Sequence, residues 1–136
     1  MKNITRFRII TGLFISLITL AGFGAKYYSG PLSLWMNNSV AGLFYEIFWC
    51  LVIVFIWPSL KPAKIALWVF LITSMLEVLQ LWHPDFLQKI RGTFLGAALL
   101  GNSFNPSDFI YYAIGCLASV ILMKYINEKT LRDITK

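Results

Sequence analysis

The residues of this 136-residue chain best suited to chemistry are a carboxylate and an amide inside an apolar stretch. Residues 63–81 read AKIALWVFLITSMLEVLQL, and Glu77 and Gln80 stand one helical turn apart near the end of this stretch. A carboxylate inside a bilayer costs about 2.5 kcal/mol or more on insertion scales, so it needs a compensating partner. Such a pair can hold a ligand, lock neighbouring helices together, or act as a general base. Ligand binding and a structural lock have about equal support from these residues.

The composition indicates an integral membrane protein. Hydrophobic residues make up 58% of the chain and charged residues 13%, whereas a soluble domain has about 25% charged residues. A membrane crossing needs roughly 20 mostly apolar residues, which leaves room for four crossings in a single domain. The spans are predicted at about residues 9–25, 40–57, 63–81 and 106–123.

The connections between the spans differ in length. Residues 29–39 contain Gly, Pro and Asn and predict a turn-rich loop. Residues 82–105 predict an outer loop with a short interfacial helix that has Pro84 in its first turn. Within it, residues 93–100 are apolar but too short to span, so they either re-enter the membrane or pack on the bundle. The expected fold class is an all-α membrane protein: four transmembrane helices with a short interfacial or re-entrant segment between helices three and four.

The ends of the last span show further signals. Asn105 and Pro106 suit a helix cap and a first helical position. The polar tail after residue 123 predicts a helical extension into water. With four spans, both termini lie on the same side of the membrane.

The basic residues predict the orientation. Nine of the twelve fall on the side of the termini and three on the other side, namely Lys2, Arg6, Arg8, Lys61, Lys64, Lys124, Lys129, Arg132 and Lys136 against Lys26, Lys89 and Arg91. The positive-inside rule therefore places both termini in the cytoplasm. Because these charges flank apolar spans in short loops, they argue against a nucleic-acid-binding protein.

Small and polar residues recur at helical spacing in every span, and each stripe includes a charged residue. The stripes are Gly12, Ser16, Thr19, Phe23 and Lys26; Gly42, Glu46 and Trp49; Thr73, Glu77 and Gln80; and Asp108, Tyr112, Gly115 and Ser119. Small and polar stripes face neighbouring helices in membranes, so the four stripes are expected to face one another, with their charges at a similar depth near the outer surface. The candidate ligand-binding residues are Glu77, Gln80, Arg91, Asp108, Glu46, Lys26 and Tyr112.

Some of these residues also have simpler explanations. Asp108 lies in the first turn of a predicted helix, where an acidic residue favours the helix dipole. Lys26 can extend its charge to the membrane interface. Arg91, with its rigid fork of donors, is harder to explain without a partner.

No metal or cofactor is expected. His83 is the only histidine in the chain, and metal ligation needs several ligands at suitable spacing. A Ser–His–Asp arrangement is excluded because the chain carries no nucleophile motif. Cys50 and Cys116 both lie in apolar segments and are interpreted as small buried residues.

Taken together, these positions resemble the VanZ-like superfamily of small bacterial membrane proteins. The resemblance rests on Glu77-x-x-Gln80, on Arg91, and on Asp108-x-x-x-Tyr112-x-x-Gly115, although Asn is usual at the position of Tyr112 and the gap of 108 − 91 = 17 positions is long. The uncharacterised branch filed as domain of unknown function 2809 is more similar. Further matching positions in that branch are Gly24, Lys26, Tyr27, Glu46, Trp49, Leu100, Gly101, Phe104 and Asp108.

The resemblance implies a multi-pass protein of the bacterial cytoplasmic (inner) membrane with a role in the cell envelope. It also implies functional roles for Glu77, Gln80, Arg91 and Asp108. Our first hypothesis is an outward-facing polar site that binds the headgroup of an envelope lipid or glycan. The alternatives are a structural subunit of a membrane complex, whose charges lock the helices to one another and whose partner is another protein, and a membrane enzyme that uses a carboxylate as general base. The residues favour an enzyme least.

Overall fold

The computed structural model describes residues 4–82, 84–100 and 106–135. These residues form helices and connections without any strand, and the expected all-α fold is confirmed. In chain order the elements are α1 (Ile4–Lys26), α2 (Ser33–Trp35), the π-helix η1 (Met36–Val40), α3 (Ala41–Ile56), α4 (Pro62–Leu79), α5 (Asp85–Arg91), α6 (Phe94–Leu100) and α7 (Asp108–Thr135).

Four helical stretches are long and apolar enough to cross a membrane, as predicted. They are Ile4–Lys26, Ser33–Ile56, Pro62–Leu79 and Asp108–Thr130. Large apolar side chains remain exposed along their outer faces, and in α7 they follow helical spacing at Ile110, Ile114, Leu117 and Ile121. An exposed apolar stripe of this kind suits contact with lipid.

The prediction of a loop over residues 29–39 is wrong for residues 33–39. The chain turns sharply at Gly30 and Leu32, which have positive φ angles of 151° and 62°, and helix begins at Ser33. The Asn37 amide donates to the carbonyl oxygens of Ala25 and Tyr28, at 2.8 and 3.0 Å. Asn37 therefore donates to carbonyls at and just beyond the end of α1, not to those of a turn of its own.

Other element boundaries differ by a few residues. α1 begins at Ile4 and not at residue 9, and α7 begins at Asp108 while Pro106 lies in a turn. Asn105 lies outside the described residues, so its predicted cap is not tested. The polar tail is helical to Thr135, as expected.

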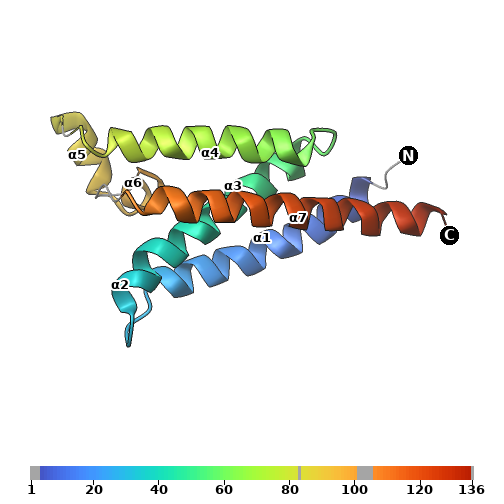
Figure 1. Ribbon diagram of the computed structural model, residues 1–136, viewed down its shortest axis with the longest axis horizontal. Helices are drawn as coiled ribbons and strands as arrows, with labels where there is room; N and C mark the ends of the chain where they lie inside the picture. Colours follow the sequence, from blue (N-terminus) through green and yellow to red (C-terminus); the bar gives the residue numbers. More distant parts are fainter. Residues whose placement is uncertain (1–3, 83, 101–105, 136) are drawn as a thin grey trace.

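Figure 1 shows how the helices are arranged. α1 and α4 run toward the end of the bundle that holds α2, α5 and α6, and α3 and α7 run back. α3 and α7 pack against each other at the centre, and α1 and α4 pack on different sides of this pair. The start of α1, the end of α7 and the connection between α3 and α4 share the opposite end.

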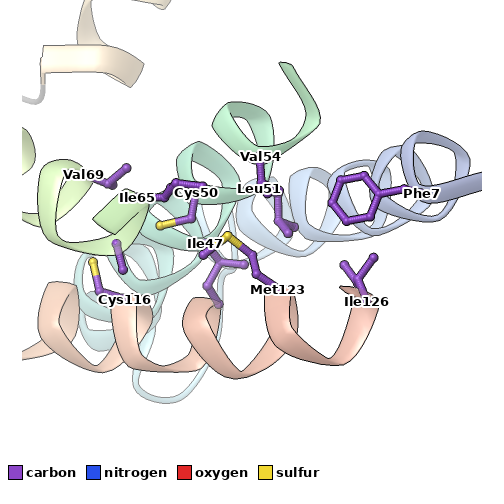
Figure 2. Packing of buried hydrophobic residues seen from close by; sticks show 11 residues of the cluster. Phe7, Ile47, Cys50, Leu51, Val54, Ile65, Val69, Cys116, Met123 and Ile126 are labelled. Carbon is purple, nitrogen blue, oxygen red and sulfur yellow. The ribbon is translucent and has the colours of Figure 1, made fainter. Parts of the chain in front are cut away.

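The half of the bundle nearest the termini is filled by apolar side chains, as Figure 2 shows. Phe7, Leu51, Val54, Met123 and Ile126 are completely buried there and come from α1, α3 and α7. We call the half defined by these five residues the closed end. Close packing of this kind holds these three helices in a fixed arrangement.

Candidate functional site

A cavity of about 500 Å³ occupies the opposite half of the bundle, which we call the open end. Residues of α1, η1, α3, α4, α6 and α7 line it. Most of the lining is apolar or aromatic, and the three charged residues among those that line it are Lys26, Glu77 and Asp108.

The two acids lie on one wall of the cavity, where α4 meets α7. The Tyr112 hydroxyl donates to Glu77 Oε2 at 2.9 Å, and the Asp108 carboxyl group is within hydrogen-bonding contact of the Glu77 carboxyl group. Glu77 is 1% exposed, and Asp108 Oδ1 is buried without a hydrogen-bond partner among the described residues. Two carboxyl groups in such contact need either a shared proton or a positive group beside them, so this wall can accept a cationic or hydrogen-bond-donating group.

Lys26 lies on a different wall, in the last turn of α1. Within the described parts of the chain, its ammonium group forms no ion pair with Glu77 or Asp108. The Phe23 ring, one turn earlier, stacks on Phe94 of α6 with centroids 6.2 Å apart. α1 and α6 therefore meet along the side of the cavity that carries the lysine.

Glu46 is not among the residues that line the cavity. Its side chain is completely buried between α3 and α7, where the Cys116 thiol donates to Oε2 at 3.0 Å. The two helices approach closely because residue 115 is glycine: a Cβ there would lie 2.8 Å from the Leu43 carbonyl oxygen and 2.9 Å from Glu46 Cβ. Glu46 thus contributes to the contact between two helices.

Glu46 lies about one helical turn further from the open end than Glu77. The Glu46 carboxyl group hydrogen-bonds with the Thr73 side chain, and Thr73 stands 77 − 73 = 4 residues before Glu77 on α4, or about 6 Å at 1.5 Å per residue. The expected similar depth of the two acids in a membrane stays a prediction.

Arg91 does not reach the acids either, contrary to expectation. Its side chain is 5% exposed, and its guanidinium group donates to the carbonyl oxygens of Trp82 and Leu79, at 2.9 and 3.1 Å. The two-pronged guanidinium joins the carbonyl of the last α4 residue, which also accepts from the Trp82 N–H, to the Trp82 carbonyl three residues further on. Arg91 therefore fixes the turn between α4 and α5.

A family model described as "Protein of unknown function (DUF2809)" matches residues 32–116. The chain belongs to this family. No solved structure matches it. The matched residues run from the turn before α2 to Cys116 in the first half of α7, so they include the acidic wall and exclude Lys26.

In this DUF2809 protein the structure brings together five of the seven predicted site residues, namely Lys26, Glu77, Gln80, Asp108 and Tyr112. The predicted stripes also meet: Thr19, Gly42, Trp49 and Thr73 line the same cavity, and a Cβ at Gly42 would lie 3.2 Å from the Tyr112 ring. Whether these residues hold a ligand stays a prediction.

Sequence reasoning missed part of the lining. Asn37 and Asn38 line the cavity from η1, and Phe94, Leu95 and Ala97 line it from α6. Two adjacent asparagines resemble an ordinary turn, so no sequence signal distinguished them. Over the described residues, no group of three or more His, Cys, Asp or Glu side chains could hold a metal ion. His83, Gly101 and Phe104 lie outside those residues.

Proposed function

We propose that this DUF2809 protein binds a membrane lipid and holds its headgroup in the cavity at the open end. The observation that carries this proposal is one cavity of about 500 Å³ that has opposite charges on different walls and a lining that is mostly apolar or aromatic. Ligand pockets have this general form, with volumes of about 300–1,000 Å³, mostly apolar walls and a few polar groups that orient the ligand.

The position of the cavity supports a ligand that arrives from the bilayer. Its lining includes α1 and α4, which pack on different sides of α3 and α7. Phe23, Phe94 and Leu95 belong to the lining and are also 42%, 60% and 67% exposed. An apolar surface continuous with the cavity suits acyl chains, while the headgroup occupies the polar walls.

The basic residues support an orientation with both termini in the cytoplasm, since nine of twelve lie on that side. The open end then faces the outer side of a bacterial cytoplasmic (inner) membrane. The pattern of Glu77, Gln80, Arg91 and Asp108 that is similar to the VanZ-like superfamily supports an envelope lipid or glycan as the ligand. In this proposal Arg91 does not contact the ligand and contributes only by fixing the turn between α4 and α5.

Filling the cavity tests the proposal. Ala41 lines it and is half-buried, so Ala41→Phe places a ring in the headgroup space. Ala21→Phe is the matched control, because Ala21 is exposed on α1 and outside the lining. We expect mass spectrometry of the detergent-purified protein to show co-purifying lipid reduced about tenfold or more by Ala41→Phe, a loss of about 1.4 kcal/mol of binding free energy, and unchanged by Ala21→Phe. Equal lipid content in both folded variants would contradict the proposal.

Two interhelical hydrogen bonds favour a second function, a structural subunit of a membrane complex. Tyr112 to Glu77 joins α7 to α4, and Cys116 to Glu46 joins α7 to α3. In this function the charges hold the helices in a shape that a partner protein recognises. Extraction in mild detergent followed by size measurement tests it: a stoichiometric partner supports it, and an isolated, fully stable monomer argues against it.

A further inference from the structure

We infer that the lipid held in the cavity is a zwitterionic phospholipid, with a phosphate and a primary amine in one headgroup. The inference rests on the proposed function and names the chemical class of its ligand. It follows from the separation of charge across the cavity and from the acceptors and donors on each wall.

The charge separation is the first step. Lys26 lines the cavity from α1, whereas Glu77 and Asp108 line it from α4 and α7, and in the described parts of the chain the lysine forms no ion pair with either acid. An ion pair with either acid would use the Lys26 charge within the protein. Because the lysine and the acids stay apart around a cavity, a ligand with two opposite charges is complementary to both walls.

The acidic wall selects the positive part of the headgroup. The Tyr112 hydroxyl already donates to Glu77, and Asp108 Oδ1 has no donor among the described residues. Asp108 therefore keeps accepting capacity on this wall. A primary ammonium group carries a positive charge and three donors and has no acceptor, so it matches this wall better than a hydroxyl or a quaternary ammonium does.

The lysine wall selects the negative part. Lys26 is half-buried and lines the cavity, and a lysine ammonium binds phosphate as a point charge. Arg91 is excluded from this role because its guanidinium group donates to the Leu79 and Trp82 carbonyls. A phosphate beside Lys26 leaves the ammonium group of the same headgroup free to reach the acids.

Other lipid classes fit one wall only. An anionic phospholipid without an amine places its phosphate beside Lys26 but leaves Asp108 Oδ1 without a donor. A neutral diacylglycerol leaves the lysine without a counter-charge. The preference among headgroups is therefore the quantity to measure.

The experiment uses delipidated protein in detergent and native mass spectrometry with equal amounts of phosphatidylethanolamine, phosphatidylcholine, phosphatidylglycerol and diacylglycerol. We expect phosphatidylethanolamine to bind about tenfold or more tightly than each of the others, because charge-assisted hydrogen bonds to both walls are made by this headgroup alone.

Substitutions on each wall test which wall produces the preference for phosphatidylethanolamine. Asp108→Asn should reduce the preference for phosphatidylethanolamine over phosphatidylglycerol to about threefold or less, and Lys26→Met should weaken both phospholipids about tenfold without weakening diacylglycerol. Asp85→Asn and Lys89→Met are the matched controls, because both residues are exposed on α5 and outside the lining, and neither should change the preference. If Asp108→Asn does not fold, Glu77→Gln tests the same wall.

The outcomes separate the two proposals. Phosphatidylglycerol or phosphatidylcholine bound as tightly as phosphatidylethanolamine overturns the inference and leaves lipid binding intact. Preference for a neutral lipid overturns it as well. No lipid bound to the folded wild-type protein, together with no effect of Ala41→Phe, overturns the proposed function itself.

Discussion

The two ends of the bundle use the same helices for different purposes. At the closed end, α1, α3 and α7 fill the space between them with Phe7, Leu51, Val54, Met123 and Ile126 (Figure 2). At the open end, the same three helices and α4 surround a cavity of about 500 Å³ with charged groups on its walls. A chain of 136 residues thus uses one half of its membrane domain for packing and leaves the other half hollow.

One device is common to both ends. Arg8 donates to the carbonyl oxygens of Phe55 and Ile56, where α3 ends, and Arg91 donates to those of Leu79 and Trp82, where α4 ends. In each case an arginine donates to carbonyl oxygens at or just beyond a helix end, where intrahelical donors run out. The ends therefore differ in how the interior is filled and share the way in which helix termini are satisfied.

The largest expected effect compares a side chain packed at the closed end with one that borders the cavity at the open end. Leu51→Ala removes a completely buried side chain from the closed end, and we expect a loss of about 3 kcal/mol in the free energy of unfolding, because the lost contacts leave a void. Leu76→Ala is the matched change at the open end, where Leu76 already borders the cavity, and should cost about 1 kcal/mol or less. Unfolding in detergent measures both. Equal losses would show that the cavity is filled in solution.

A smaller effect is expected for the arginines. Arg91→Ala removes two hydrogen bonds from a residue that is 5% exposed, and we expect a loss of about 2 kcal/mol, the usual size for buried bonds to a charged group. Arg8→Ala should cost less, because Arg8 is exposed and water replaces its bonds. Thermal unfolding in detergent compares the two variants. A stable Arg91→Ala protein that has lost lipid binding would place Arg91 at the ligand after all.

The smallest effect concerns adjacent tyrosines of α7. Tyr112→Phe deprives the buried Glu77 carboxylate of a donor at 2.9 Å, with an expected loss of about 1 kcal/mol in stability. Tyr111→Phe removes an acceptor of the exposed Trp35 indole N–H at 2.8 Å, and water can take its place, so the loss should be smaller. The difference in unfolding midpoint between the variants reports how much the Tyr112 hydroxyl stabilises the acidic wall. A larger loss of stability for Tyr111→Phe than for Tyr112→Phe would contradict the prediction that the buried hydrogen bond contributes more.

The sequence predicted most of the fold because apolar length and helical spacing act locally. Four apolar stretches appeared close to their observed bounds, and the stripes that contain Gly42, Thr73 and Tyr112 do face a common space. Errors arose where a side chain binds a distant backbone. Asn37 was assigned to a loop because its partners, the carbonyls of Ala25 and Tyr28, are invisible in a local pattern.

In the candidate site, too, some features follow from the sequence and others only from the tertiary structure. The sequence by itself determined that carboxylates occupy apolar helices, that such groups need partners, and that Glu77, Asp108 and Tyr112 lie on inward faces, because charge, hydropathy and the 3.6-residue period are properties of the chain. Tertiary structure alone decided which groups meet. The close approach at Gly115 buries Glu46 against Cys116, the end of α4 takes Arg91, and Lys26 remains at the cavity without an ion pair to its acids. Each outcome depends on distances between helices that are far apart in the chain, and packing sets those distances.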